Sequence, residues 1–344
     1  MKALKKIPGP WGAIRRHTSI LLPRVTVSRI LNLVLVGYEM LFRRTRLFSK
    51  PVIAKIEASS ACNLRCKGCR TGWPFMEYQT GNLSVSDFNI ILDKIGKYLF
   101  EVVFYIWGEP LLNKNIGKLI DAAHRRNIAV IISTNLHFLT AEMGEILIDS
   151  QLDKMIFCID GWSQRTYEEV RAKGDFELVK NNIGRFVEQK KARDSKKPYL
   201  EWQYVVTENN KTELPLAQRA AHGWGVERFV SLVDWAKRLE TRDFFKGLDR
   251  VKEKMRKKIN RCFWLWSAIT IQYDGTVFPC CHVANKPHEN RMYANILRQD
   301  LNAAWNSEKF QQARLLLKSK RQINDGHIVC SKCFSPPIFI ELKE

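Results

Sequence analysis

After residue 50, the chain alternates short runs rich in β-branched and aromatic residues with amphipathic stretches. The six β-rich runs cover residues 52–58, 101–107, 128–134, 154–160, 200–206 and 227–233. Between them, apolar residues recur at helical spacing, as in Phe88, Ile91, Leu92 and Ile95. Repeated strand-then-helix units predict a parallel sheet with functional loops at its C-terminal edge. We therefore expect an α/β fold, a partial (β/α)6 barrel of the TIM type, over residues 51–233.

Composition limits the class of protein. A chain of 344 residues with 45% hydrophobic residues can bury a large core and still carry an appendage. Its nine cysteines are too few for a secreted disulfide scaffold, and their close spacing suits metal ligation in a reducing compartment. No apolar signal region closely follows the basic first residues, so we expect a cytoplasmic protein.

Three cysteines lie directly after the first β-rich run. The stretch SSACNLRCKGCRTG contains Cys62, Cys66 and Cys69. Thiolates select zinc, copper(I) or iron-sulfur clusters. A structural zinc site needs four protein ligands, whereas an iron-sulfur cluster held by three thiolates leaves one iron open. The triad thus predicts an open, catalytic cluster site. The alternative is a closed metal knuckle that borrows a remote ligand.

The Cys-X3-Cys-X2-Cys spacing after the first strand of a β/α barrel resembles the signature of radical S-adenosylmethionine (SAM) enzymes. The resemblance implies that Cys62, Cys66 and Cys69 hold a 4Fe-4S cluster whose open iron binds SAM. An electron then cleaves SAM to methionine and a 5'-deoxyadenosyl radical, which removes a hydrogen atom from the substrate. It also implies a low-potential electron donor such as flavodoxin or ferredoxin. Gly68 stands where many relatives have an aromatic residue.

The same resemblance assigns five cofactor-binding residues. Glu109 in YIWGEPLLN would accept hydrogen bonds from the methionine ammonium, and Ser133 and Asn135 in STN would approach the ribose or carboxylate. Cys158 replaces a serine of the family pattern, and Arg171 would bind the SAM carboxylate with its planar fork. The alternatives are a simple turn at Glu109, helix capping by Ser133 or Asn135, a small buried hydrophobe at Cys158 and a surface ion pair at Arg171.

A second group of cysteines occupies residues 262–344. Cys262 and Cys280 flank a predicted hairpin with the turn YDGTV, and Cys330 and Cys333 form a distant Cys-X2-Cys. The group resembles the SPASM/twitch extension of radical SAM enzymes, which implies a small C-terminal α+β module with a second, auxiliary 4Fe-4S cluster. Four thiols can also bind zinc, so a structural zinc site is the alternative.

Two basic segments complete the chain. Residues 1–50 hold eleven Lys or Arg and one acid, Glu39, and residues 234–261 are predicted to form a basic helical connector. In a helix, Arg29, Asn32, Glu39 and Arg43 would form one polar stripe within otherwise apolar sequence. This pattern favours a helix in the headgroup layer of an anionic membrane, on the inner face of the cell membrane. The alternative is a helix packed on the protein's own core.

The sequence favours an oxidoreductase that oxidises or epimerises a small molecule, namely a sugar, a cyclitol or a lipid-linked intermediate. A ribosomal peptide or protein maturase is the alternative, although residues 1–50 are too few for the leader-binding domain of roughly 80 residues that many maturases carry. A third hypothesis uses the net charge of +21 for nucleic-acid binding. No known nucleic-acid module is evident, so no nucleic-acid partner is expected.

Overall fold

The computed structural model describes residues 19–66, 69, 71, 79–233, 262–280, 292–319 and 330. Cys333 and the predicted connector 234–261 lie outside these residues.

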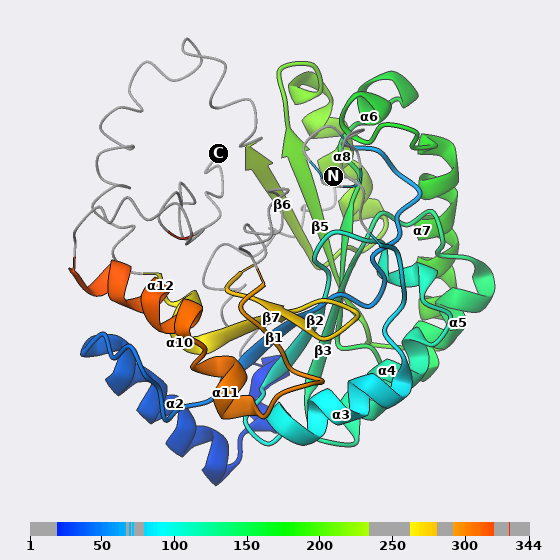
Figure 1. Ribbon diagram of the computed structural model, residues 1–344. Helices are drawn as coiled ribbons and strands as arrows, with labels where there is room; N and C mark the ends of the chain where they lie inside the picture. Colours follow the sequence, from blue (N-terminus) through cyan, green and yellow to red (C-terminus); the bar gives the residue numbers. More distant parts are fainter. Residues whose placement is uncertain are drawn as a thin grey trace.

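Six parallel strands form the main sheet, as the alternating pattern predicts (Figure 1). Neighbouring strands pair in sequence order from β1 to β6, and all five pairings are parallel. The strands are β1 (Ile53–Ile56), β2 (Glu101–Phe104), β3 (Ala129–Thr134), β4 (Lys154–Cys158), β5 (Tyr199–Val206) and β6 (Arg228–Val233). The sheet does not close on itself among the described residues, which confirms the partial barrel.

Helices follow the strands and cover the outer face of the curved sheet (Figure 1). They are α3 (Val85–Ile95), α4 (Ile116–His124), α5 (Ala141–Asp149), α6 (Gln164–Val170), α7 (Phe176–Ala192) and α8 (Leu214–Gly223). Side chains at the N-caps of α3, α5, α6 and α7 each accept a hydrogen bond from a main-chain N–H in the first turn. Short 3-10 turns occupy η1 (Leu22–Arg24), η3 (Pro110–Leu112) and η4 (Lys211–Glu213).

The two faces of the sheet differ in polarity. On β1, Ala54 and Ile56 belong to the large core beneath the helices. Because side chains alternate along a strand, Lys55 faces the inside of the barrel. The inner face also carries a small apolar cluster of Val103, Ile131 and Ile156. The barrel interior is therefore part apolar and part charged.

The C-terminal module continues the same sheet. Its elements are α10 (Trp264–Ser267), β7 (Ala268–Ile271), β8 (Thr276–Phe278), β9 (Ala294–Asn295), α11 (Leu301–Trp305) and α12 (Glu308–Ser319). β7 pairs parallel with β1, and β8 and β9 follow antiparallel. The predicted hairpin is confirmed, with Gly275 at a φ of 82° in its turn. The division of the chain into four segments stays a prediction.

The predicted N-terminal helix is α2 (Val27–Leu41). Its polar stripe faces the protein, since Arg29, Asn32 and Glu39 are buried. The sequence did not predict this direction. No helix of the described chain is both long and apolar enough to cross a membrane.

Candidate active site

The cysteine loop leaves β1 at the C-terminal edge of the sheet. Cys62, Cys66 and Cys69 are partly exposed free thiols. Within the loop, the Cys69 N–H donates to the carbonyl of Cys66 at 3.0 Å. The Arg65 N–H donates to the carbonyl of Ala172 at 2.9 Å, and its guanidinium donates to the carbonyl of Cys62 at 2.8 Å. The loop is thereby tied to the turn after α6, where Arg171 lies.

The Gly-Glu-Pro segment crosses directly over the start of the cysteine loop. The Glu109 N–H donates to the carbonyl of Ala61 at 2.8 Å. A Cβ placed on Gly108 would lie 1.8 Å from the carbonyl oxygen of Ser59. Glycine is therefore required at position 108 by the close approach of two main chains, which a simple turn would not require.

The Glu109 carboxylate is buried, with 2% of its surface exposed. It accepts hydrogen bonds from the Thr134 hydroxyl and the Asn135 N–H, both at 2.8 Å, and from the Leu111 N–H at 3.1 Å. Burial raises the pKa of Glu109 to about 7, although these donors favour the charged form. The sequence analysis did not select Thr134. Its hydroxyl at the end of a strand, within the STN segment itself, was the available signal.

The polar ends of β3 and β4 lie beside the cysteine loop. The Asn135 side-chain amide donates to Asn63 Oδ1 at 3.0 Å and lies 3.8 Å from Cys62 Sγ. On β4, burial raises the pKa of the Cys158 thiol to about 11, while a hydrogen bond with Ser133 acts in the opposite direction. Ser133, Asn135 and Cys158 are thus brought to the same edge as the predicted cluster.

Arg171 forms an ion pair with a carboxylate that is fully buried. Its Nε donates to Asp160 Oδ2 at 2.5 Å, and Asp160 has no exposed surface. Burial opposes the charge of Arg171, but Asp160, Cys158 and Cys66 hold its pKa well above the usual range. Burial raises the pKa of the Cys66 thiol, while the charge of Arg171 and its hydrogen bond to Cys66 act in the opposite direction. The ion pair of Arg171 with Asp160 lies within the site and is therefore not the surface ion pair of the alternative.

His137 is a further residue of this region that sequence reasoning missed. Its Nε2 accepts from the Asp175 N–H at 3.0 Å, and its Nδ1 lies 3.1 Å from Asn135 Oδ1. Burial lowers the pKa of His137, so the neutral ring donates from Nδ1 to Asn135. His137 therefore positions Asn135 and the start of α7.

Two of the auxiliary cysteines, Cys280 and Cys330, lie near Tyr293. The Tyr293 hydroxyl lies 3.9 Å from Cys330 Sγ. Burial raises the pKa of Tyr293, and both Cys330 and Cys280 raise it further. In the hairpin, β8 runs antiparallel to β7 with Phe278 opposite Thr270. The chain after β8 therefore runs back toward α10 and Cys262.

The three thiols of the cysteine loop suit a cluster better than a single ion. In the described part of the chain, no three His, Cys, Asp or Glu side chains are close enough together to hold one metal ion. The thiolates of an iron-sulfur cluster can lie farther apart than the ligands of a single ion, because each thiolate binds a different iron. Cys62, Cys66 and Cys69 on one loop fit this arrangement, with the Arg171 guanidinium beside Cys66.

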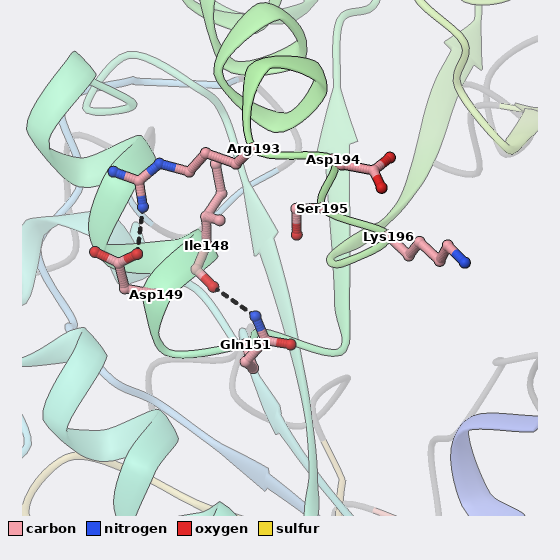
Figure 2. A pocket seen from close by; sticks show the side chains of 7 residues that line it. All are labelled: Ile148, Asp149, Gln151, Arg193, Asp194, Ser195 and Lys196. Atoms are coloured by element: carbon pink, nitrogen blue, oxygen red, sulfur yellow. Dashed lines mark hydrogen bonds and ion pairs between the residues drawn. The ribbon is translucent and has the colours of Figure 1, made fainter.

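A surface pocket elsewhere holds none of these residues (Figure 2). Figure 2 shows it lined by Ile148, Asp149, Gln151, Arg193, Asp194, Ser195 and Lys196. These residues lie at the end of α5 and in the segments that follow α5 and α7, before β4 and β5, at the N-terminal edge of the sheet. The pocket is therefore at the opposite edge from the cysteine loop.

Comparison with protein families agrees with this geometry. Residues 56–193 match the radical SAM superfamily, and residues 262–334 match the SPASM iron-sulfur cluster-binding domain.

Relatives are distant. The chain is 29% identical over 180 residues to the tungsten-containing aldehyde ferredoxin oxidoreductase cofactor-modifying protein of Pyrococcus furiosus, covering 51% of this chain and 49% of that protein. It is 28% identical over 132 residues to the mycofactocin maturase MftC of Mycolicibacterium smegmatis, covering 38% and 32%. The chain thus spans about half or less of these relatives' length. The structure of Streptococcus suis SuiB bound to SAM superposes with a TM-score of 0.60 at 17% identity, covering 79% of this chain and 69% of SuiB.

A partial β/α barrel with a three-cysteine loop at its C-terminal edge defines an iron-sulfur enzyme core. The chain belongs to the radical SAM superfamily and carries a C-terminal SPASM domain. Membership implies a 4Fe-4S cluster and SAM at the first site and auxiliary iron-sulfur binding at the second.

Proposed function

We propose that this enzyme cleaves SAM reductively and uses the resulting radical to oxidise or epimerise a polar small molecule, namely a sugar, a cyclitol or a lipid-linked intermediate. The observation that carries the proposal is the buried carboxylate of Glu109, fixed by three donors and hydrogen-bonded through its own N–H to the cysteine loop. An anchored carboxylate at this place suits an ammonium group.

A cluster bound at this site would supply the electron for reductive cleavage of SAM to methionine and a 5'-deoxyadenosyl radical. Cys62, Cys66 and Cys69 would hold that cluster, and Arg171, which lies beside Cys66, would bind the SAM carboxylate. Glu109 would orient the methionine ammonium, and Ser133, Asn135 and Cys158 would line the cofactor's other side. A second 4Fe-4S cluster would be held by Cys262, Cys280, Cys330 and Cys333, and a low-potential flavodoxin or ferredoxin would deliver the electron.

The interior of the barrel favours a polar substrate. Lys55 lies on the inner face of β1, with its ammonium 4.4 Å from the ring centre of Tyr105 and 5.2 Å from that of Trp264. On β5, Glu201 pairs with Lys154 and Arg228, at 2.8 and 2.9 Å. Buried charges in a barrel interior are costly unless they serve a bound molecule or each other.

A peptide maturase is the second candidate. It is supported by the similarity to the maturase MftC and by the fold likeness to SuiB, a structure of which contains its precursor peptide SuiA. The two candidates differ in what must enter the barrel. A hydroxylated small molecule and a peptide can be told apart by which one increases 5'-deoxyadenosine formation above the slow rate without substrate.

The binding role of Glu109 is tested with Glu109→Gln. We expect weaker SAM binding, by a factor of ten or more, because a charge-assisted hydrogen bond contributes about 1.5 to 3 kcal/mol. Iron content should stay unchanged. Thr134→Val is the matched control, since it removes one donor to Glu109 and keeps the charge. The measurement is equilibrium dialysis of SAM against anaerobically reconstituted protein, with thermal unfolding of each variant.

Wild-type SAM affinity in Glu109→Gln would contradict the assigned role. A loss in Thr134→Val equal to that in Glu109→Gln would assign the effect to the hydrogen-bond network and not to the carboxylate charge. Absence of 5'-deoxyadenosine from the reduced, fully loaded wild-type enzyme would contradict the proposed reaction itself.

A further inference from the structure

Helix α2 buries its polar side and exposes most of its apolar side, which is the reverse of the usual arrangement. Its inward residues Arg29 and Glu39 are 2% and 1% exposed, whereas Val27, Val34 and Leu41 are 75%, 66% and 76% exposed. A surface helix of a globular domain normally turns its apolar stripe to the core and its charges to water. Some other contact must therefore favour this outward apolar face.

The inward direction of Arg29 is fixed by main-chain acceptors. Its Nη1 donates to the carbonyls of Arg24 and Asn127, at 2.6 and 2.7 Å. Its Nη2 donates to the carbonyls of Gly96 and Arg126, at 3.2 and 3.1 Å. The acceptors at Gly96, Arg126 and Asn127 precede β2 and β3, so α2 is held against the N-terminal edge of the sheet. Turning the helix over would leave them without their partner, which is costly inside a protein.

Asn32 and Glu39, the other residues of the stripe that lie within α2, are satisfied in the same way. Asn32 exchanges two hydrogen bonds with the main chain of Lys50, at 2.9 and 2.8 Å. The Glu39 carboxylate accepts from the N–H groups of Phe48 and Ser49, at 2.6 and 3.2 Å. These hydrogen bonds fix the orientation of α2 and the position of residues 48–50. With its polar side held inward, the helix exposes its apolar side.

The outward surface is wide and continuous. Val27, Leu31, Val34, Tyr38 and Leu41 are spaced four and three residues apart, which places them on one side of the helix. All five are exposed, from 48% for Tyr38 to 76% for Leu41. We name these five residues the α2 apolar face. Figure 1 shows α2 at the periphery of the molecule, beside the C-terminal helices.

The segment that carries this face is strongly basic. Glu39 is the only acidic residue among residues 1–50, and it is buried. Arg44 and Arg46, just after the helix, are exposed. Two copies of such a segment would repel each other, whereas anionic lipid attracts each basic residue by about 1 kcal/mol. An apolar face with a basic fringe therefore fits a lipid surface better than a second copy of the chain.

We propose that the α2 apolar face docks this enzyme on the surface of an anionic phospholipid membrane, with α2 lying in the plane of the headgroups. The docking does not depend on the proposed reaction. Because α2 contacts the N-terminal edge of the sheet, the cysteine loop at the opposite edge then faces away from the lipid. The membrane thus fixes the location of the enzyme, and a lipid-linked substrate would need a polar headgroup that reaches the barrel mouth.

The test uses full-length, cluster-loaded protein and vesicles of phosphatidylglycerol mixed with phosphatidylcholine. We expect co-sedimentation with the mixed vesicles at low salt, partial release at high salt, and little binding to phosphatidylcholine alone. The triple variant Leu31→Gln, Val34→Gln, Leu41→Gln should bind at least about tenfold more weakly, because it removes apolar contact. Glutamine preserves helix propensity.

The matched control is Ile90→Gln, Leu178→Gln, Leu216→Gln, which changes three apolar residues on other helices with exposures of 43%, 40% and 40%. It should bind like the wild type. Equal binding by the α2 variant, or an equal loss in the control, overturns the proposal. Equal binding of the wild type to vesicles with and without phosphatidylglycerol also overturns the proposal.

Two further measurements identify a different occupant. Sedimentation velocity of the wild type and the α2 variant, without lipid, should give the same monomer mass. If the wild type is a dimer and the α2 variant is a monomer, the α2 apolar face is the interface with a second copy of the chain. A clear fall in the unfolding temperature of the variant would mean that another part of this chain covers the face. Iron content and 5'-deoxyadenosine formation should not change, which separates failure of docking from failure of the proposed reaction.

Discussion

Two buried glutamates at opposite edges of the sheet show how differently the same side chain can be used. Glu39, in α2, accepts from two main-chain N–H groups and closes the loop at Phe48 and Ser49. Glu109, at the C-terminal edge, accepts from three donors, and burial still raises its pKa to about 7. The first carboxylate completes a local structure. The second is held beside a loop of thiols that can take a cluster.

The contrast extends to the surroundings of each residue. Around Glu109, glycine and close main-chain contacts bring the loops together, and partly exposed thiols remain available. Around Glu39, the polar groups face inward and apolar side chains face out. One edge is built to receive a polar cofactor, and the other presents an apolar surface to its environment. The following substitutions test this comparison.

The largest effect is expected from replacing Cys62, Cys66 and Cys69 together by Ala. SAM cleavage should be abolished, and iron should fall from about eight to about four per chain, because one of two 4Fe-4S clusters is lost. Iron analysis and 5'-deoxyadenosine formation after anaerobic reconstitution provide the readouts. Cys158→Ala, the control for loss of a thiol, should keep all the iron. Zinc at the second site in place of four irons would contradict the auxiliary cluster.

Gly108→Ala should disrupt the crossing between the two loops. The new Cβ would meet the Ser59 carbonyl oxygen at 1.8 Å, and this main-chain atom cannot move without shifting the cysteine loop. We expect a loss of at least about 2 kcal/mol in the free energy of unfolding, together with weaker SAM binding. Gly184→Ala is the control, because nothing lies within 4 Å of its new Cβ. Equal stabilities of the two variants would show that the loops do not approach this closely.

The comparison also shows where sequence reasoning succeeds. The alternation of β-rich and amphipathic runs depends on local periodicity, so the six strands and the helices α3, α4 and α5 were predictable. The pairing of β7 with β1 joins residues that are more than 200 positions apart in the sequence, and no local pattern encodes it. Thr134 and His137 were missed for the same reason, since their roles depend on Glu109, Asn135 and Asp175 being close in space.

The direction of α2 was unpredictable for another reason. Periodicity identifies a polar and an apolar side of a helix, but it does not say which side faces the protein. The orientation of α2 is set by the carbonyls of Gly96, Arg126 and Asn127, which accept hydrogen bonds from Arg29 only in the folded barrel.

Asp153 anchors the N-terminal edge and should give an intermediate effect. It accepts from Arg24 at 3.0 Å, Lys197 at 2.6 Å and His124 at 2.9 Å. Burial opposes its charge, but these partners and the Val130 N–H hold the pKa of Asp153 well below its usual range. We expect Asp153→Asn to lower the free energy of unfolding at neutral pH by about 2 to 4 kcal/mol. Denaturant unfolding of both proteins measures this cost.

The sign of the pH dependence follows from the lowered pKa. The contribution of Asp153 is fully present above its unfolded pKa of about 4 and is lost as the pH falls toward the lower folded value. The difference between wild type and Asp153→Asn should therefore shrink in acid. Asp93→Asn, in an exposed pair with Arg126, should cost less than about 1 kcal/mol. If the difference in the free energy of unfolding between wild type and Asp153→Asn does not decrease in acid, the assigned ion pairs are wrong.

The smallest effect is expected from Gly37→Ala on the exposed side of α2. Nothing lies within 4 Å of a Cβ built at this glycine, and Gly37 is inside the helix. Alanine should therefore raise the free energy of unfolding by about 0.5 to 1 kcal/mol, because glycine loses more conformational entropy in a helix. A shift of the denaturation midpoint with an unchanged slope measures this gain. A loss of stability would mean that the new methyl group meets another part of the protein. The outward side of α2 would then be covered, and the contrast between the two edges would fail at the point where docking on lipid depends on it.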